Sequence, residues 1–190
     1  ALFGSVRTAN RNGRLMASFH EGIDIAPVRR NRQGHPLDEV LAVAEGKVAY
    51  VNNVTGNSTY GKYVVVEHKD PMGLIYTLYA HLASVAVERG AAVTPGHVLG
   101  RMGNTATYTI PMSRAHLHFE VGVILNNRFD RWYDAQKLKP SHGLCHGWNL
   151  LGVNPLDFFA LQRANRLMKF ADVLDATAVA FELAIKAGRV

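Results

Sequence analysis

The strongest constraint on the fold is a pair of apolar stretches of strand length, separated by a turn sequence. Tyr63–Glu67 (YVVVE) and Leu74–His81 (LIYTLYAH) are rich in Val, Ile, Leu and Tyr. Between them, His68–Gly73 (HKDPMG) supplies Asp, Pro and Gly, which are the residues that turns favour. Two short apolar runs around such a turn predict a β-hairpin, so we expect an antiparallel sheet.

Further strand-like segments extend this sheet. Glu39–Val51 (EVLAVAEGKVAYV) carries short β-branched stretches broken at Gly46, and Gly90–Gly103 is punctuated by glycines. His116–Val123 (HLHFEVGV) alternates as a half-buried strand does. This central part of the chain is therefore predicted to be mainly antiparallel β.

The character of the chain changes after Pro155, where Ala and Leu replace the β-branched residues. Asn154 and Pro155 form a typical helix start, and apolar residues recur near helical spacing over Leu156–Ile185. One or two helices are expected to follow the sheet. We expect them to pack on it, and a membrane-surface or partner helix is the less favoured interpretation.

Composition excludes several classes of protein. Hydrophobic residues make up 48% and charged residues 19% of the 190 residues, which excludes intrinsic disorder. No stretch reaches the roughly 18 apolar residues of a transmembrane helix. Cys145 is the only cysteine, so no disulfide can form within the chain.

The charge balance is basic, with 21 Lys and Arg against 15 Asp and Glu and a net charge of +6. The densest basic run, Arg29 to Arg32, lies in a polar loop and is interpreted as solvated surface. The sequence shows no zinc-finger spacing, basic helix or aromatic RNA-binding motif, so nucleic acid is not the expected partner. Ala1–Asn10 lacks the basic start and apolar run of a signal peptide.

Residues with metal-binding chemistry concentrate in two short segments. His116 and His118 (HLH) stand two apart in a predicted strand, so both side chains reach the same face. His20 and Asp24 (HEGID) stand four apart and share a face if the segment is extended. Two imidazoles and one carboxylate form the ligand set of a catalytic zinc site that keeps one position for water. The helical HExxH signature is excluded, because Asp24 stands where its second His belongs.

These segments occur in an order that resembles the lysostaphin and LytM type of zinc metalloendopeptidase, a family that cleaves peptides of bacterial peptidoglycan. Phe19–Pro27 (FHEGIDIAP) is similar to the family's first ligand motif, and Asn154–Phe159 (NPLDFF) is similar to its closing segment. The motifs between them follow in the family's order: VLAVAEGKVAYV, YGKYVVVEH, YTLYAHL, RGAAVTPGHVLGRMGNT and AHLHFEV. The resemblance implies a mainly β, antiparallel, barrel-like metallopeptidase domain over residues 1–159, with an insertion at 126–153 and a helical C-terminal extension at 160–190.

Carried over residue by residue, the resemblance makes His20, Asp24 and His118 the zinc ligands. It places His116 and His81 beside the metal. His116 would accept a proton from the attacking water, and His81 would hydrogen-bond that water or the developing oxyanion, although these two roles can be exchanged. Glu120 continues the alternation of the HLH strand, and it either orients a ligand imidazole or lies at the wet end of the strand.

The insertion at 126–153 departs from the family pattern. It is expected to cover the sheet in preference to edging the substrate groove. His142, Cys145 and His146 within it lack a clear fourth ligand, so a second metal site there is the less favoured interpretation. The insertion also contains four large aromatic residues, Phe129, Trp132, Tyr133 and Trp148.

The resemblance implies a zinc-dependent endopeptidase that hydrolyses peptide bonds in the peptidoglycan stem or cross-bridge, located in the periplasm or secreted. The alternative is a non-catalytic binding or regulatory module that activates other cell-wall hydrolases. The enzyme is favoured because all five chemical positions are filled. A metal-free barrel module for small ligands or sugars has little beyond the glycine-rich strands in its favour. The bond that is cut, D-alanyl to diamino acid or glycyl-glycine, is left open.

Overall fold

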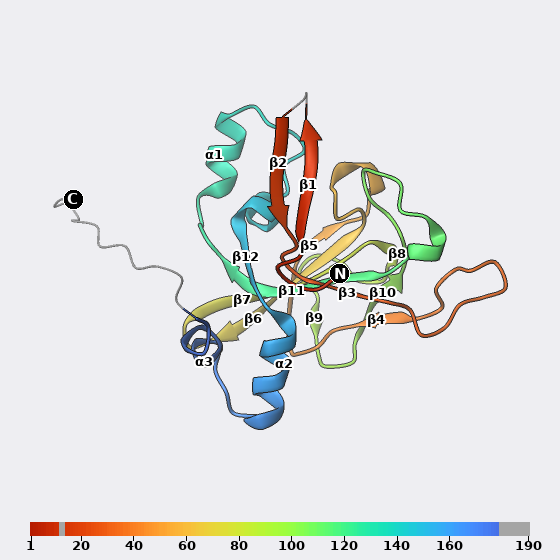
Figure 1. Cartoon of the computed structure of the whole chain (residues 1–190). Coiled ribbons are helices and arrows are strands. Elements are labelled where there is room, and N and C mark those ends of the chain that lie inside the picture. Colours follow the sequence, from red (N-terminus) through yellow and green to blue (C-terminus); the bar gives the residue numbers. More distant parts are fainter. Residues whose placement is uncertain (12–13, 179–190) are drawn as a thin grey trace.

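Two antiparallel sheets and one separate hairpin form the β structure of the computed structural model, which describes residues 1–11 and 14–178 (Figure 1). The main sheet has the strand order β12–β11–β7–β6–β5–β9, with β3 paired to β11. The smaller sheet has the order β4–β10–β8, and β1 pairs with β2. The strands are β1 (Val6–Arg11), β2 (Arg14–Phe19), β3 (Ile23–Ile25), β4 (Glu39–Leu41), β5 (Gly46–Asn52), β6 (Tyr63–Asp70), β7 (Gly73–Ala80), β8 (Leu82–Val85), β9 (Ala92–Val93), β10 (Val98–Met102), β11 (Leu117–Ile124) and β12 (Leu150–Val153).

The predicted fold class, mainly antiparallel β, is confirmed. Every strand pairing among the described residues is antiparallel. Over the same residues both sheets run as open paths with free edges, so they do not close into the barrel that the resemblance implied.

The predicted hairpin forms the centre of the main sheet. β6 and β7 pair from Val64 opposite Tyr79 to Asp70 opposite Gly73. The turn is therefore tighter than the predicted six-residue segment. Gly73 has a φ of +128°, which favours glycine, and the Asp70 side chain accepts a hydrogen bond from the Met72 N–H at 2.9 Å.

Both faces of this hairpin are buried, which explains its continuous apolar sequence. Val64 and Val66 point into a core shared with the smaller sheet. Tyr63 and Val65 point to the opposite face, where a second apolar cluster forms. Strands buried on both faces read as unbroken apolar runs because neither face needs polar residues.

The insertion covers that second face. It contains helix α1 (Phe129–Ala135) and β12, which extends the main sheet beside β11. Cys145 and Leu150 from the insertion are buried in the second apolar cluster. The expectation that this segment covers the sheet therefore agrees with the packing.

Two helices follow the sheet, α2 (Pro155–Ala164) and α3 (Phe170–Asp175). The Asn154 side chain caps α2 by accepting from the Leu156 N–H at 3.1 Å. Phe159 stacks on Phe119 of β11, with ring centroids 5.8 Å apart, and Phe170 of α3 is buried in the main core. The predicted helical stretch reaches Ile185, and its last residues, 179–190, lie outside the described residues. None of the described helices combines the length and apolarity that membrane crossing requires.

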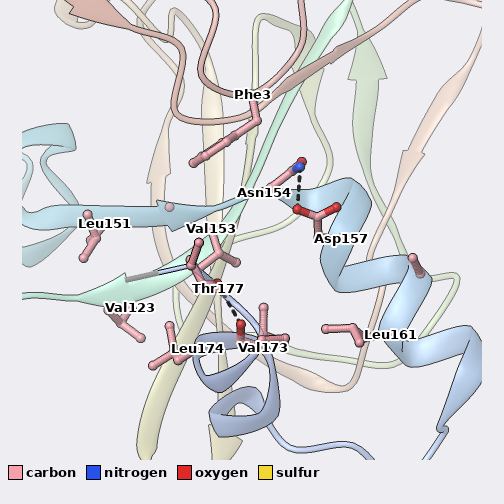
Figure 2. Close-up of a pocket in the computed structure, with 14 residues that line it drawn as sticks. Phe3, Val123, Leu151, Val153, Asn154, Asp157, Leu161, Val173, Leu174 and Thr177 are labelled. Carbon is pink, nitrogen blue, oxygen red and sulfur yellow. Dashed lines mark hydrogen bonds between the residues drawn. The ribbon is translucent and has the colours of Figure 1, made fainter. Parts of the chain in front are cut away.

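An apolar cavity of about 650 Å³ lies between β12, α2 and α3 (Figure 2). Leu151, Leu161 and Leu174 are among the side chains that line it. None of the five residues predicted to carry the chemistry contributes to its lining. The cavity belongs to the packing of the C-terminal helices and does not contain the candidate site.

Candidate metal centre

Strand pairing brings the two metal-binding segments together. β3 pairs with β11 so that Asp24 lies directly opposite His118. Gly22, just before β3, makes this approach possible, because a Cβ atom there would lie 2.3 Å from the carbonyl oxygen of Phe119. His20 precedes the strand rather than lying within it, and its ring reaches the same point.

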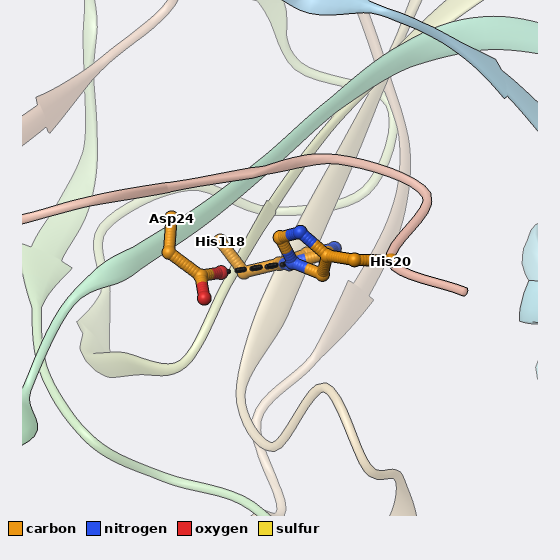
Figure 3. Close-up of side chains that lie close together, drawn as sticks. All are labelled: His20, Asp24 and His118. Carbon is orange, nitrogen blue, oxygen red and sulfur yellow. Dashed lines mark hydrogen bonds and ion pairs between the residues drawn. The ribbon is translucent and has the colours of Figure 1, made fainter. Parts of the chain in front are cut away.

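Three atoms that could ligate a metal ion converge at this point (Figure 3). Nε2 of His20 lies 2.8 Å from Nδ1 of His118 and 3.0 Å from Oδ1 of Asp24. Nδ1 of His118 lies 3.2 Å from the same carboxylate oxygen. Tetrahedral ligands at zinc-like bond lengths of about 2.0–2.1 Å stand roughly 3.3 Å apart, so the three atoms are spaced for one small cation. Among the residues that the structure describes, this is the single cluster of such ligands.

The opposite ring nitrogens hold both imidazoles in place. Nδ1 of His20 lies 3.0 Å from the Leu2 carbonyl oxygen, which can only accept. Nε2 of His118 lies 2.7 Å from Oε1 of Glu120. Each ring therefore carries a proton on its outer nitrogen and can direct a lone pair inward when it is neutral. Outer hydrogen bonds of this kind are typical of metal-binding histidines.

Glu120 orients a predicted ligand and does not lie at a wet strand end. Its side chain is fully buried. Besides His118, it accepts hydrogen bonds from the hydroxyl of Tyr60 at 2.7 Å and from that of Tyr76 at 3.0 Å. Burial, together with the neighbouring Glu120 charge, raises the pKa of both tyrosines well above the ordinary value, so they remain donors. Sequence reasoning found Glu120 and missed both tyrosines.

Charge within the cluster favours an ionised Asp24. Burial by itself would raise the pKa of Asp24, but hydrogen bonds from His118 and His20 hold it well below its usual range. Burial likewise would lower the pKa of His118, but its hydrogen bonds to Asp24 and Glu120 raise it to about 9. In the absence of a cation, the two carboxylates therefore hold a proton on Nδ1 of His118, which a bound metal ion would replace.

His116 and His81 stand beside the three convergent residues, with their ring centroids 4.8 Å apart. Nε2 of His116 lies 3.4 Å from Oδ1 of Asp24. Nδ1 of His116 lies 2.7 Å from the Arg114 carbonyl oxygen, and Nδ1 of His81 lies 2.8 Å from the Thr105 carbonyl oxygen. Because a carbonyl oxygen can only accept, the proton of each ring is fixed on Nδ1. Each neutral ring therefore has Nε2 as its acceptor nitrogen.

His81 is held in an unusual backbone conformation, with a φ of +60°. Its backbone N–H donates to the Tyr60 carbonyl at 2.9 Å. Burial lowers the pKa of its side chain to about 4, so the ring is neutral near pH 7. A residue other than glycine in this region of backbone space is a feature of functional sites, where the surrounding structure imposes it.

The second group of potential ligands in the insertion does not form a metal site. Both ring nitrogens of His142 have other partners, the Tyr50 hydroxyl at 2.8 Å and the Asn57 carbonyl at 3.0 Å. Burial raises the pKa of the Cys145 thiol to about 12, which disfavours a thiolate ligand.

Comparison with known proteins agrees with the motif order. Residues 18–130, more than half of the chain, match the model of Peptidase family M23. The chain is 40% identical over 72 residues to the peptidoglycan DD-endopeptidase ShyA of Vibrio cholerae, a match that covers 37% of this chain and 15% of that protein. It is 30% identical over 102 residues to the uncharacterized lipoprotein YgeR of Escherichia coli, covering 54% of this chain and 34% of that protein.

The fold also has a solved counterpart. The catalytic domain of the antimicrobial peptidase lysostaphin from Staphylococcus simulans aligns with a TM-score of 0.51 at 19% identity, covering 84% of this chain and 90% of that domain. At that identity the likeness concerns the fold alone. The match of the family model over residues 18–130 includes all five residues of the site. The chain belongs to peptidase family M23.

Proposed function

We propose that this chain is a zinc-dependent endopeptidase that hydrolyses peptide bonds in the stem or cross-bridge of peptidoglycan. The observation that carries the proposal is the convergence of His20, Asp24 and His118 within 3.2 Å, beside two further imidazoles. Membership of a peptidase family supports hydrolysis of a peptide bond.

His20, Asp24 and His118 would hold the zinc ion through Nε2, Oδ1 and Nδ1. A zinc ion bound there would polarise a peptide carbonyl and lower the pKa of a water molecule to about 7. The chain's own contribution is to hold the two ligand imidazoles in fixed orientations, through Leu2 for His20 and Glu120 for His118.

His116 and His81 would handle the protons. Nε2 of His116, next to Asp24, would accept the proton of the attacking water and later pass it to the leaving amine. His81 is neutral and has its Nδ1 proton engaged at Thr105, so its Nε2 would orient the water by accepting a hydrogen bond. Donation from His81 to an oxyanion would first require a second proton on the ring. These observations support His116 as the base and His81 as the residue that orients the water.

The relatives support the proposed substrate and location. ShyA carries the name of a peptidoglycan endopeptidase, and YgeR that of a lipoprotein. This chain spans 15% and 34% of their lengths, so their whole-protein activities come to it only as a proposal. A net charge of +6 suits an anionic polymer, and we place the chain in the periplasm or outside the cell.

The test is elemental analysis of the purified protein together with digestion of isolated peptidoglycan, with and without a chelator, and mass analysis of the fragments. One zinc per chain and chelator-sensitive peptide cleavage are expected, and the fragments identify the bond. Absence of cleavage after zinc has been added would contradict the proposed endopeptidase and favour the non-catalytic module.

A further inference from the structure

A cavity of about 740 Å³ lies between the insertion and the segments that build the metal centre. Tyr133, His146 and Trp148 line it from the insertion. Glu21 and Tyr60 line it from the other side. Glu21 follows the predicted ligand His20 directly in the chain, so the cavity begins next to the site.

Packing contacts tie this cavity closely to the metal centre. The Tyr60 ring lies 5.6 Å from the His118 ring, centroid to centroid. Gly147 packs on that same Tyr60 ring, because a Cβ atom at Gly147 would stand only 3.2 Å from its Cε2 and hydroxyl. The residue after Gly147 is Trp148, so the Tyr60 ring lies beside both a predicted ligand and the residue that precedes Trp148.

A second cavity, of about 900 Å³, continues past the metal centre on the other side. Asp24 and His116 line it. The two cavities share Ser18 and Thr59 in their linings. They therefore adjoin each other at these two residues, and we treat them as two arms of a groove beside the predicted ligand Asp24, with Trp148 in the arm that Tyr60 lines.

Trp148 is largely exposed, with 64% of its surface accessible, yet its position is fixed. Its ring packs edge-on against His146 at 5.1 Å and against Tyr133 at 6.2 Å. Its backbone N–H donates to Nδ1 of His146 at 3.1 Å. An exposed aromatic face that is already ordered binds a flat apolar surface with little further loss of conformational entropy.

The rest of this arm combines polar and apolar side chains and is nearly uncharged. Hydroxyl and amide groups of Asn57, Ser58, Thr59 and Thr107 line it together with apolar side chains such as Phe19 and Leu151. Glu21 and Lys139 are its only described residues that ordinarily carry full charge. His146 adds a donor, because its Nδ1 accepts from Trp148 and the neutral ring therefore carries its proton on Nε2. Burial lowers the pKa of His146, which favours that neutral ring.

We propose that this arm of the groove is a sugar subsite, in which the Trp148 ring stacks on an N-acetylated amino sugar of the glycan to which the substrate peptide is attached. A pyranose ring presents one face of C–H groups and a rim of hydroxyl and amide groups, which match the indole face and the hydroxyl and amide groups of the lining. The backbone of a peptide presents no ring face of this kind. The inference rests on the proposed function, since it names a further part of the same substrate.

The chain has two tryptophans, so each can be observed alone by fluorescence. Trp132 is a matched control, since it is 50% exposed, belongs to the same insertion and does not line this cavity. Trp132→Phe leaves Trp148 as the reporter, and Trp148→Phe leaves Trp132. Each variant is titrated with the disaccharide of N-acetylglucosamine and N-acetylmuramic acid, and separately with a stem peptide that carries no sugar.

The expected result is a saturable blue shift or quenching of Trp148 by the disaccharide and no change in Trp132. Equal responses of both tryptophans, no response of Trp148, or a response of Trp148 to the peptide alone would each overturn the sugar subsite. Because this readout is binding, it separates the two proposals. A fluorescence change of Trp148 without peptide cleavage would support the sugar subsite and contradict the endopeptidase. Cleavage without a fluorescence change would support the endopeptidase and contradict the sugar subsite.

A kinetic comparison adds a second readout. Trp148→Ala is expected to raise KM about tenfold for a peptide linked to the disaccharide, which corresponds to the loss of one aromatic stacking contact. The same variant should leave KM for the free peptide unchanged, and Trp132→Ala should change neither. An equal loss on both substrates would show that Trp148 contacts the peptide.

Discussion

Nε2 of His118 lies 2.7 Å from a carboxylate oxygen of Glu120, and Glu120 is fully buried beneath the candidate metal centre. A carboxylate in this place does two things for a ligand imidazole. It fixes the ring orientation, and it raises the basicity of the nitrogen that faces the metal. A metal site built on His118 would therefore depend on a residue that does not itself face the cation.

Replacing Glu120 with Gln tests this dependence. We expect Glu120→Gln to weaken zinc affinity by about 10–100-fold, since the amide keeps the size of the side chain and removes its charge. Competition with a chromophoric chelator measures the affinity. Glu88→Gln, at an exposed carboxylate, is the control and should bind zinc as the parent does. Unchanged affinity in Glu120→Gln would contradict the assigned role.

Tyr76→Phe removes one of the three hydrogen bonds to Glu120. A buried carboxylate oxygen then loses its donor, and the free energy of unfolding should fall by about 1–3 kcal/mol. Urea denaturation followed by circular dichroism measures the change. Tyr108→Phe, at a ring that is 51% exposed, should alter stability little. Equal stability of the two variants would show that the Tyr76 hydroxyl is not needed to satisfy Glu120.

The roles of the two histidines of the HLH motif can be separated. His118→Ala is expected to lose both zinc and peptidase activity. His116→Ala is expected to keep zinc, because His116 is not one of the three convergent ligands, and to lose about a hundredfold or more in kcat. Elemental analysis and peptide hydrolysis on the same preparations provide the comparison. A fully active His116→Ala would mean that the proton passes through another group.

Gly22 is required for the approach of β3 to β11. In Gly22→Ala the new methyl group would meet the Phe119 carbonyl at 2.3 Å and the Glu120 side chain at 2.9 Å. We expect a loss of about 1–3 kcal/mol in stability together with weaker zinc binding, because the strand carrying Asp24 must shift. Thermal unfolding with and without zinc measures both effects. Gly56→Ala, where a Cβ has open space, is the tolerated counterpart, and equal behaviour of the two would refute the packing argument.

A pH-dependent part of the stability comes from His68, far from the metal ligands in the chain. Its ring nitrogens lie 2.7 Å from the Glu45 carbonyl oxygen and 2.8 Å from the Thr77 hydroxyl. Burial lowers the pKa of His68 below 6.5, so the folded state favours the neutral ring. This contribution is present above pH 6.5, the value for the unfolded chain, and is lost as the pH falls toward the lowered pKa.

The measurement is the urea midpoint at about pH 8 and about pH 5.5. His68→Gln should show a smaller difference between the two midpoints than the parent protein. His35→Gln, at an exposed histidine, should keep the parent's difference. A parent-like pH response in His68→Gln would place the sensitivity elsewhere.

Much of the fold could be predicted because the strands that matter are strongly marked. The hairpin of β6 and β7 has unbroken apolar runs around Asp, Pro and Gly, and no helix suits that pattern. The pairing of β1 with β2 was not predicted. In the sequence only Asn12 and Gly13 separate the two strands, a pair typical of two-residue hairpin turns, but the mostly polar residues from Arg7 to Ala17 offer no apolar alternation that would mark the strands.

The convergence of His20, Asp24 and His118 could be anticipated, because His116 and His118 share a strand face and the order of the motifs resembles that of a metallopeptidase family. The hydrogen bonds that hold Glu120 in place beneath these residues could not be predicted. Tyr60 and Tyr76 lie 60 and 44 residues from Glu120. Tyr60 lies in a turn outside the strands, and Tyr76 lies in the apolar strand β7, where a tyrosine looks like ordinary packing. Only the tertiary arrangement of these distant segments decides which hydroxyl meets which carboxylate.

The insertion that lines the groove also seals the back of the main sheet. Its Cys145 and Leu150 cover an apolar layer that contains Tyr63 and Val65 of the central hairpin. This segment therefore cannot be exchanged as a surface loop in order to alter substrate choice, because removing it would expose that layer to water and to other chains. Changes in selectivity have to be made at individual positions on its groove side, such as Trp148, while the residues behind them stay as they are.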